Sequence, residues 1–342
     1  MNFYQENGYL NAELIYNLGF PFNFIITPRG TGKTYNFLSV GRKLGRLPLF
    51  LRRTQNQCDI ISRKAMNPYA SVARDEGWDF QISQVTKGII GVDEVDEEGN
   101  KIRELCYMGA LSTISNIRGF DGSLIDTILF DEFVPERHEK PIKNEADALL
   151  NCFETINRNR ELSGKKPVQL ICMANANKLD SPILMGLGLL PKIESMLKKD
   201  QQCSLLPEKG VALFILSHSP ISAKKAETAL YKLTEGTKFA QMALKNEFAY
   251  TDTSGVQSLS LDGMIPMVII DDIEIYQHKE NRQLYASSHI SGSPPRYSSL
   301  SPEKVRQFQA QAPWLYYQLL QDNVIFESFE IKSKLLSIYR LQ

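Results

Sequence analysis

The sequence predicts an α/β protein built mainly on a parallel sheet. Short apolar runs of strand length recur along the first two thirds of the chain, and longer stretches with helical periodicity separate several of them. Buried strands that are joined by helical crossovers are typical of a parallel sheet. The chain has 342 residues, which is enough for about two domains.

Five apolar runs are the expected strands, at residues 22–27, 48–51, 127–130, 168–174 and 211–216. Two further strand-like segments within residues 89–108 flank the turn EEGN, which predicts a hairpin. We expect its acidic residues to form a solvated tip; they are Asp93, Glu94, Asp96, Glu97 and Glu98.

The pattern changes after the fifth strand, where residues 219–248 are helical in character and a polar stretch follows. We predict a first domain over residues 1–216, a helical linker region over 217–254 and a small α+β domain over 255–342. In the small domain we expect strands at 267–276, 282–288 and 323–331, and a helix over 301–320 that is interrupted at Pro313.

Composition limits the classes of function. Lys and Arg together number 39, as do Asp and Glu, so a protein with a general positive coat is excluded and any nucleic acid must meet local patches. The five cysteines include no CxxC pair and indicate reduced thiols. The sequence has neither a signal peptide pattern nor a membrane-spanning apolar stretch, so we expect a cytoplasmic protein with no membrane partner.

The segment TPRGTGKT follows the first expected strand and precedes a helical segment, which is the context of a phosphate-binding P-loop. We expect Lys33 to reach the β and γ phosphates of a nucleotide and Thr34 to bind Mg²⁺. Thr27 stands where the usual pattern has its first glycine. The predicted nucleotide-binding residues are Thr27, Pro28, Arg29, Gly30, Thr31, Gly32, Lys33 and Thr34.

Two later strands end in polar residues that complete such a site. The segment ILFDE predicts that Asp131 holds Mg²⁺ and that Glu132 orients and deprotonates the attacking water. The segment VQLICMANAN ends in the polar residues Asn175 and Asn177. We select Asn175, for which contact with the γ-phosphate or the water and an Asx turn are equally good interpretations.

The ordered motifs TPRGTGKT, LFLRRTQNQ, ISNIRGFDGSLIDTILFDEF and VQLICMANAN resemble those of large terminases and DNA packaging ATPases of tailed bacteriophages. Chain length, Arg29 in the P-loop and the RG pair at 118–119 fit the encapsidation protein of small protein-primed podophages (Picovirinae) best. The resemblance implies a P-loop ATPase domain of the additional-strand type with a catalytic glutamate, and a small ribonuclease-H-like C-terminal domain. ATP and Mg²⁺ are the implied cofactors.

The resemblance further implies a ring, usually of five subunits, that docks on the portal of a prohead in the host cytoplasm and drives double-stranded DNA inward. A packaging RNA is a further candidate partner.

Such rings complete each site with an arginine from the neighbouring subunit. We expect a helix after ILFDE with an apolar stripe (Ala146, Leu149, Leu150, Phe153 and Ile156) to continue into NRNR, where Arg158 and Arg160 point about 200° apart. Arg158 is preferred because it lies off the stripe, Arg160 is the alternative, and Arg29 is a candidate within its own subunit.

Local positive charge supplies candidate DNA contacts. Residues 27–66 contain nine basic residues and one acid, and Lys and Arg are the residues that meet DNA phosphates. In VPERHEK, the loop after Glu132, we select Arg137 and Lys140; Arg63 and Lys64 are second choices, and the alternating acids of the loop weaken the case.

We expect the C-terminal domain to be an inactive relative of a nuclease, because the spacing of Asp271, Asp272, Glu274, Glu327 and Glu330 is not persuasive for two metals. We place Asp271 and Asp272 in one strand, on opposite sides. Three alternatives to a DNA translocase remain: a terminase with an active nuclease, a phage ring helicase, and a nucleotide switch that turns ATP over negligibly.

Overall fold

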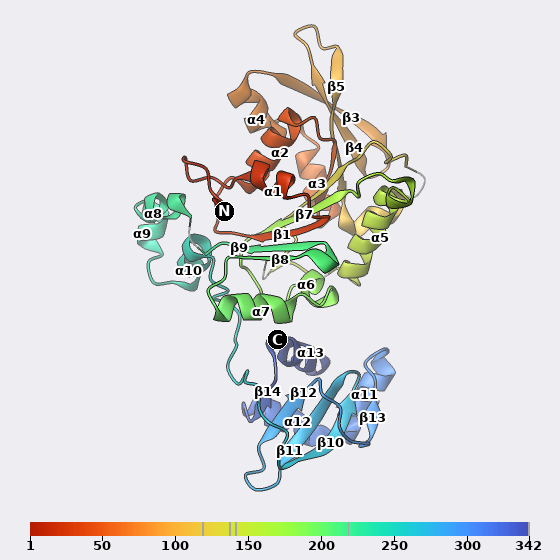
Figure 1. Cartoon of the computed structure of the whole chain (residues 1–342), viewed down its shortest axis with the longest axis vertical. Helices are drawn as coiled ribbons and strands as arrows, with labels where there is room; N and C mark the ends of the chain where they lie inside the picture. The colour runs from red at the N-terminus through yellow and green to blue at the C-terminus, as the bar shows by residue number, and fades with distance from the viewer. Residues whose placement is uncertain (118–119, 137, 141, 218, 341–342) are drawn as a thin grey trace. The chain divides into compact units, whose positions relative to one another are not determined.

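The computed structural model describes residues 1–340 apart from 118–119, 137, 141 and 218, and it divides into two compact units (Figure 1). The first unit comprises Met1–Leu187 and Ser195–Tyr250, and the second comprises Gly188–Glu194 and Thr251–Gln342. None of the helices in the described part of the chain has the length and apolar character that a membrane crossing needs.

A nine-stranded sheet forms the centre of the first unit, in the order β3-β4-β5-β2-β6-β7-β1-β9-β8. The six strands from β5 to β9 in this order are parallel, whereas β3 and β4 at one end and β8 at the other pair in antiparallel fashion. The expected α/β class is therefore confirmed. The strands are β1 Phe22–Ile26, β2 Pro48–Arg52, β3 Asp79–Thr86, β4 Ile89–Val95, β5 Lys101–Ala110, β6 Thr127–Asp131, β7 Gln169–Ala174, β8 Cys203–Leu206 and β9 Val211–Ile215.

Helices cover both faces of this sheet, because the strands are near-continuous apolar runs whose successive side chains point to opposite faces. Ile25, Leu129 and Phe214 share a core with α1, α2 and α4, whereas Phe22, on the other face of β1, contacts Phe153 of α5. The helices up to β8 are α1 Ala12–Leu18, α2 Lys33–Lys43, α3 Gln55–Ile61, α4 Tyr69–Glu76, α5 Glu145–Asn157, α6 Pro182–Gly186 and α7 Leu190–Lys198. Short 3₁₀ turns lie at Lys64–Met66, Leu111–Ile117, Glu161–Ser163 and Pro207–Lys209.

The predicted hairpin is formed by β4 and β5, but its acidic cluster is only partly a solvated tip. Asp93 and Glu94 are each 7% exposed. Glu94 pairs with Arg42 and Arg103, and Asp93 pairs with Lys101. The two carboxylates are buried because each has a cation partner, so the prediction of a solvated cluster was wrong for these two residues.

Three short helices follow β9, where one helical stretch was expected: α8 Pro220–Ala226, α9 Ala229–Leu233 and α10 Lys238–Lys245. They are bonded to the end of β1 and the loop after it. Asn246 donates to the carbonyl of Ile26 at 2.9 Å, and the amide of Arg29 donates to the carbonyl of Ala243 at 3.0 Å. Residues 217–250 therefore belong to the first unit and differ from the separate linker region predicted over 217–254.

The second unit is α+β, with a five-stranded sheet in the order β13-β10-β11-β12-β14. Its strands are β10 Met264–Ile270, β11 Ile273–His278, β12 Leu284–Ser287, β13 Arg296–Tyr297 and β14 Val324–Phe326, and its helices are α11 Pro302–Gln311, α12 Pro313–Leu320 and α13 Phe329–Tyr339. The break between α11 and α12 lies at Pro313, as predicted.

Two predictions in the second unit were wrong. Residues 267–276 are not one strand, because Asp271 has a φ of 53° and makes the turn of the β10–β11 hairpin together with Asp272. The last expected strand is shortened to β14, because Ser328 caps a helix by accepting a hydrogen bond from the amide of Ile331.

Candidate functional site

The P-loop lies between β1 and α2, as the sequence predicts. Gly30 and Gly32 have φ values of 76° and 69°, and the helix begins at Lys33. Thr27 is fully buried, has no positive φ, and its hydroxyl lies 2.7 Å from that of Thr31. A glycine is therefore not needed at position 27, which explains how the loop forms without the usual first residue.

Lys33 lies at the centre of the loop. Its Nζ donates to Oδ1 of Asn175 at 2.8 Å, to the hydroxyl of Thr27 at 3.1 Å and to the carbonyl of Pro28 at 3.2 Å. Burial lowers the pKa of Lys33 to about 8, although the nearby carboxylates of Asp131 and Glu132 act in the opposite direction. The ammonium is thus held among neutral acceptors, and an anionic ligand would stabilise its charged form.

Asn175 follows β7, and β7 lies between β1 and β6 in the sheet. This is the additional strand that the predicted ATPase type requires between the P-loop strand and the strand that ends in Asp131. Asn175 is brought against Lys33, and its side-chain Oδ1 accepts from Nζ of that lysine. The bond from the amide of Asn177 goes to the backbone carbonyl of Asn175, which is a γ-turn and not the Asx turn that was the alternative interpretation.

Thr34 and Asp131 are in contact, with the Thr34 hydroxyl donating to Oδ2 of Asp131 at 2.8 Å. A hydroxyl and a carboxylate are oxygen ligands suited to Mg²⁺, which commonly keeps only one or two protein ligands beside waters and phosphate oxygens. The described residues contain no cluster of three or more His, Cys, Asp or Glu that could hold a metal. The pair therefore fits Mg²⁺ bound together with a nucleotide, and does not fit a metal held by the protein alone.

Glu132 lies at the end of β6 in a left-handed conformation with a φ of 58°. Its side chain is 49% exposed and pairs with Arg52, at 2.8 Å between Oε2 and Nη1. Burial raises the pKa of Glu132, and the charge of Arg52 partly offsets this. A carboxylate with a raised pKa beside a P-loop is suited to accept a proton from water.

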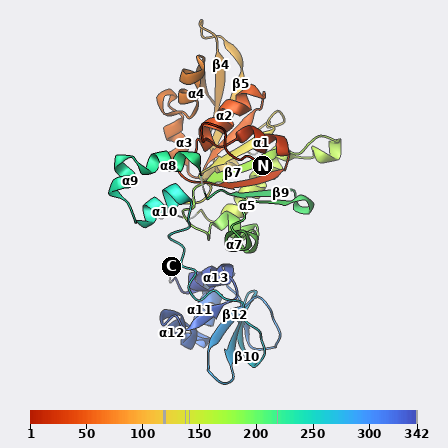
Figure 2. The same cartoon turned by 60° about the vertical axis from the view of Figure 1, so that its left-hand side comes forward.

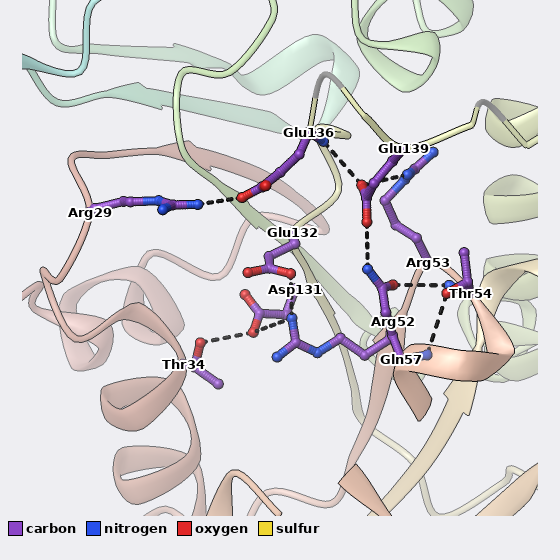
Figure 3. A network of polar contacts seen from close by, with 10 residues as sticks. All are labelled: Arg29, Thr34, Arg52, Arg53, Thr54, Gln57, Asp131, Glu132, Glu136 and Glu139. Atoms are coloured by element: carbon purple, nitrogen blue, oxygen red, sulfur yellow. Dashed lines mark hydrogen bonds and ion pairs between the residues drawn. The ribbon is translucent and has the colours of Figure 1, made fainter. Parts of the chain in front are cut away.

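Sequence reasoning missed two arginines that organise this edge of the sheet (Figure 3). Arg52 ends β2, the neighbour of β6, and contacts both Glu132 and Asp131. Arg53 is completely buried and pairs with Glu145 and Glu139 at 2.8 and 2.9 Å. The signal in the sequence was the pair Arg52 and Arg53 at the end of an expected strand. That strand, β2, pairs with β6, which ends in the two acids.

The loop after Glu132 is tied to its surroundings by two further acids. Glu136 pairs with Arg29 of the P-loop. Glu139 accepts from Arg53 and Gln57, and also from the amide of Glu136 at 3.0 Å. Arg29 is therefore engaged with an acid of its own chain in this structure.

A pocket of about 490 Å³ lies at the P-loop. One wall is the P-loop together with Asp131, Glu132 and Asn175, and another wall comes from helices α8, α9 and α10. The second set was not predicted from the sequence; it consists of Lys225, Leu230, Tyr231 and Phe239.

The two candidate trans arginines are not on a helix. Helix α5 ends at Asn157, and Arg158 follows it with a φ of 48°, so the comparison of their directions on a helix was wrong. Arg158 is 51% exposed, contacts Asp121 at 3.8 Å and donates to the carbonyl of Phe120 at 3.1 Å. Arg160 donates to the carbonyls of Ser123 and Ile125. The stripe of α5 is also interrupted, because Leu150 is 42% exposed.

The basic stretch 27–66 is largely neutralised by acids from other segments. Seven of its nine cations pair with carboxylates; they are Arg29, Arg42, Lys43, Arg46, Arg52, Arg53 and Lys64. Arg63 and Lys140 are exposed. Arg137 and the RG pair at 118–119 lie outside the described residues.

The five acids of the second unit that were considered as metal ligands of a nuclease accept hydrogen bonds or form ion pairs within the fold. Asp271 accepts from the amide of Ser299 at 2.8 Å, and Glu327 accepts from the amide of Ser288 at 2.7 Å. Asp272 and Glu330 pair with one lysine, Lys334, and Glu274 is fully buried and accepts from the amide of Ser291.

Fold and site together define a protein with the P-loop NTPase fold of the additional-strand type, with its acids and its asparagine at the carboxyl edge of the parallel strands. Within that class, the chain belongs to the podovirus DNA encapsidation protein (Gp16) family, whose model matches residues 3–271. The family expected from the motifs is confirmed.

Individual relatives agree with this family. The DNA packaging protein of Bacillus phage B103 is 26% identical over 243 residues, which cover 66% of this chain and 64% of that protein. The DNA packaging protein of Bacillus phage phi29 is 28% identical over 148 residues, which cover 43% and 40%. The chain thus spans less than two thirds of the length of these curated relatives.

Solved structures show the same fold. A chain of the bacteriophage Phi-29 viral genome packaging motor assembly matches with a TM-score of 0.65 at 19% identity, over 97% of this chain and 99% of that chain. A chain of the Phi-28 gp11 DNA packaging motor matches with a TM-score of 0.61 at 17% identity, over 95% of each chain.

Proposed function

We propose that this protein is an ATPase that moves double-stranded DNA into a prohead. The observation that carries the proposal is the convergence of Lys33, Thr34, Asp131 and Glu132 at one edge of the sheet, in a chain of a DNA encapsidation family. The relatives are described as DNA packaging proteins, and the matched structures come from packaging motors.

In the proposed mechanism, Lys33 binds the β and γ phosphates, and Thr34 and Asp131 would hold Mg²⁺, which would neutralise phosphate charge. Glu132 orients the attacking water and accepts its proton. Asn175, whose Oδ1 accepts from Nζ of Lys33 at 2.8 Å, contacts the γ-phosphate in this proposal. The residues that act on the nucleotide thus lie at the ends of three neighbouring strands, β6, β7 and β1.

The remaining parts of the proposal concern assembly. A ring of about five subunits docks on the portal in the host cytoplasm, with a packaging RNA as a further candidate partner. Arg158 of one subunit completes the site of the next. It is preferred to Arg160 because its side chain is 51% exposed and donates to one backbone carbonyl, that of Phe120, whereas Arg160 donates to two. Arg29 is the candidate within the same subunit. Arg137, Lys140, Arg63 and Lys64 are the proposed DNA contacts.

The decisive experiment is protection of DNA from nuclease by proheads, protein and ATP. We expect protection with the wild-type chain and none with Glu132→Gln, which retains ATP binding and loses ATPase rate on the order of 10² or more. A Glu132→Gln variant with undiminished ATPase would contradict the assigned role. Negligible ATPase in the wild type, with proheads and DNA present, would instead establish a nucleotide switch.

Two further assays distinguish a DNA translocase from a helicase and from a nuclease. Unwinding of a forked substrate would indicate a helicase. Mn²⁺-dependent plasmid cutting that is abolished by Asp271→Ala would indicate a terminase with an active nuclease. We expect neither activity, and the engagement of Asp271 with the amide of Ser299 supports the second expectation.

A further inference from the structure

The wall of the pocket formed by residues 220–245 carries a lysine that the mechanism above does not use. Helices α8, α9 and α10 lie together beside the sheet in both views (Figures 1 and 2). Lys225, near the end of α8, lines the same pocket as Lys33 and Thr34. The segment therefore brings a second ammonium group to the phosphate loop.

The position of this ammonium is well defined. Nζ of Lys225 donates to the carbonyl of Arg29 at 2.6 Å and lies 5.1 Å from the centre of the Tyr231 ring. Tyr231 is 6% exposed and stacks on Phe239. The buried ring of Tyr231 thus contacts the ammonium of Lys225 on one side, and the ammonium donates its hydrogen bond to the P-loop.

Close approach to the loop depends on a glycine. A Cβ atom at Gly30 would lie 2.7 Å from Nζ of Lys225, and the φ of 76° at Gly30 also favours glycine. The Arg29 peptide is bonded to the segment on both sides, since its amide donates to Ala243 and its carbonyl accepts from Lys225. The middle of the phosphate loop is therefore directly attached to α8 and α10.

The electrostatics of the pocket favour an anionic partner for Lys225. No carboxylate pairs with it among the residues that the structure describes, and its acceptor is a neutral carbonyl. Its charge also opposes the charged form of Lys33 and contributes to the lowered pKa of that residue. A polyphosphate on the loop would relieve this repulsion and offer a stronger, charged acceptor.

We propose that Lys225 is a second phosphate-binding lysine, which transfers its hydrogen bond from the Arg29 carbonyl to a phosphate oxygen of a bound nucleoside triphosphate. The inference rests on the proposed function, because it assumes that the pocket binds a nucleotide. Tyr231 acts as a positioning residue that holds the ammonium over the loop. Binding at the loop is thereby linked to α8–α10.

The experiment measures binding of the slowly hydrolysed analogue ATPγS with Mg²⁺ to the full chain by calorimetry. The variants are Lys225→Ala, Lys225→Arg and Lys225→Gln, and the matched control is Lys224→Ala, which removes an exposed lysine one residue earlier on α8. We expect Lys225→Ala to weaken binding roughly 10-fold or more, as for other charge-assisted hydrogen bonds. Lys225→Arg should retain most of the affinity, and Lys224→Ala should match the wild type.

Lys225→Gln separates phosphate binding from a structural role. Glutamine can still donate to the Arg29 carbonyl but carries no charge, so we expect it to bind as weakly as Lys225→Ala. Wild-type affinity in Lys225→Gln or in Lys225→Ala would overturn the role of Lys225 and leave the proposed function intact. Failure of the wild-type chain to bind the analogue, in contrast, would overturn the proposed function itself.

Discussion

Nη1 of Arg52 lies 2.8 Å from Oε2 of Glu132 and 3.5 Å from Oδ2 of Asp131, so one guanidinium contacts both acids at the end of β6. Arg52 is the last residue of β2, the strand that pairs with β6 in parallel. The neighbouring strand thus controls the charge and direction of the carboxylate that we assign to water activation.

Removal of Arg52 should shift the pH dependence of ATP hydrolysis. Burial raises the pKa of Glu132, and the Arg52 charge lowers it, so Arg52→Ala raises this pKa further. Glu132 accepts a proton only when it is ionised, and activity therefore increases with pH through its pKa. We expect the acidic limb of the kcat/KM profile to move to higher pH in Arg52→Ala, and Arg52→Lys to restore it in part.

The control for this shift is Arg46→Ala, which removes a guanidinium that pairs with Asp126 at the other end of β6. Its acidic limb should coincide with that of the wild type. An unchanged limb in Arg52→Ala would show that the ion pair does not set the ionisation of Glu132.

Nucleotide affinity should decrease in alkaline solution. Burial lowers the pKa of Lys33 to about 8, and bound phosphates favour its charged form, so binding near or above pH 8 takes up a proton. We expect affinity for ATP to fall by up to tenfold per pH unit above about 8. Calorimetry in two buffers of different ionisation enthalpy measures the proton uptake directly.

Lys33→Arg is the matched variant for this measurement, because arginine stays charged throughout the range. Its affinity, whatever its absolute value, should not vary with pH between about 7 and 9.5. Proton uptake that persists in Lys33→Arg would assign the titration to another group.

Subunit mixing tests the arginine that we propose to act between subunits. Arg158→Ala and Glu132→Gln should each abolish most ATPase activity in a ring, and a mixture should regain activity at interfaces that combine an intact Arg158 with an intact Glu132. The same mixture made with Arg160→Ala is the comparison. If no ratio of Arg158→Ala to Glu132→Gln restores ATPase, the assignment of Arg158 is wrong.

Loss of the buried Arg53 should destabilise the first unit strongly. Arg53→Met leaves the carboxylate of Glu145, which is 1% exposed, without its cation, and removal of one partner of a buried ion pair costs about 3–5 kcal/mol. We expect the free energy of unfolding in urea to fall by about this amount. The double variant Arg53→Met with Glu145→Met should recover most of the loss.

The exposed pair Arg74–Asp75 offers a control for this measurement. Arg74→Ala should change stability by less than about 0.5 kcal/mol, as is usual on the surface. Equal stability of the Arg53→Met single and double variants would indicate that the stranded carboxylate is not the cause.

The sequence predicted the parts of the site that local patterns encode. The P-loop, the strand that ends at Asp131 and the strand before Asn175 each combine an apolar run with polar residues at its end, and a parallel sheet brings such ends together. The pairing of Arg53 with Glu145 joins residues 92 apart in the chain, and no local pattern specifies it. The wall from α8–α10 was missed for the same reason.

Local signals also failed where turn residues were unusual. The hairpin at Asp271 and Asp272 contains no glycine, so the apolar residues on both sides resemble one strand. Helix α5 ends at Asn157 without a glycine or proline, because Arg158 itself adopts a positive φ of 48°. In both cases the fold imposes a conformation that the residue type does not favour.

The loop after Glu132 alternates acids with cations, and the acids would weaken its attraction for a polyanion. Glu136 and Glu139, however, are paired with Arg29 and Arg53, and Lys140 next to them is exposed. A duplex that approaches this loop therefore meets a surface on which the acids of the loop are already neutralised by cations from other segments. Charge counted along a sequence and charge presented to a partner are different quantities, and here the ion pairs beneath the loop account for the difference.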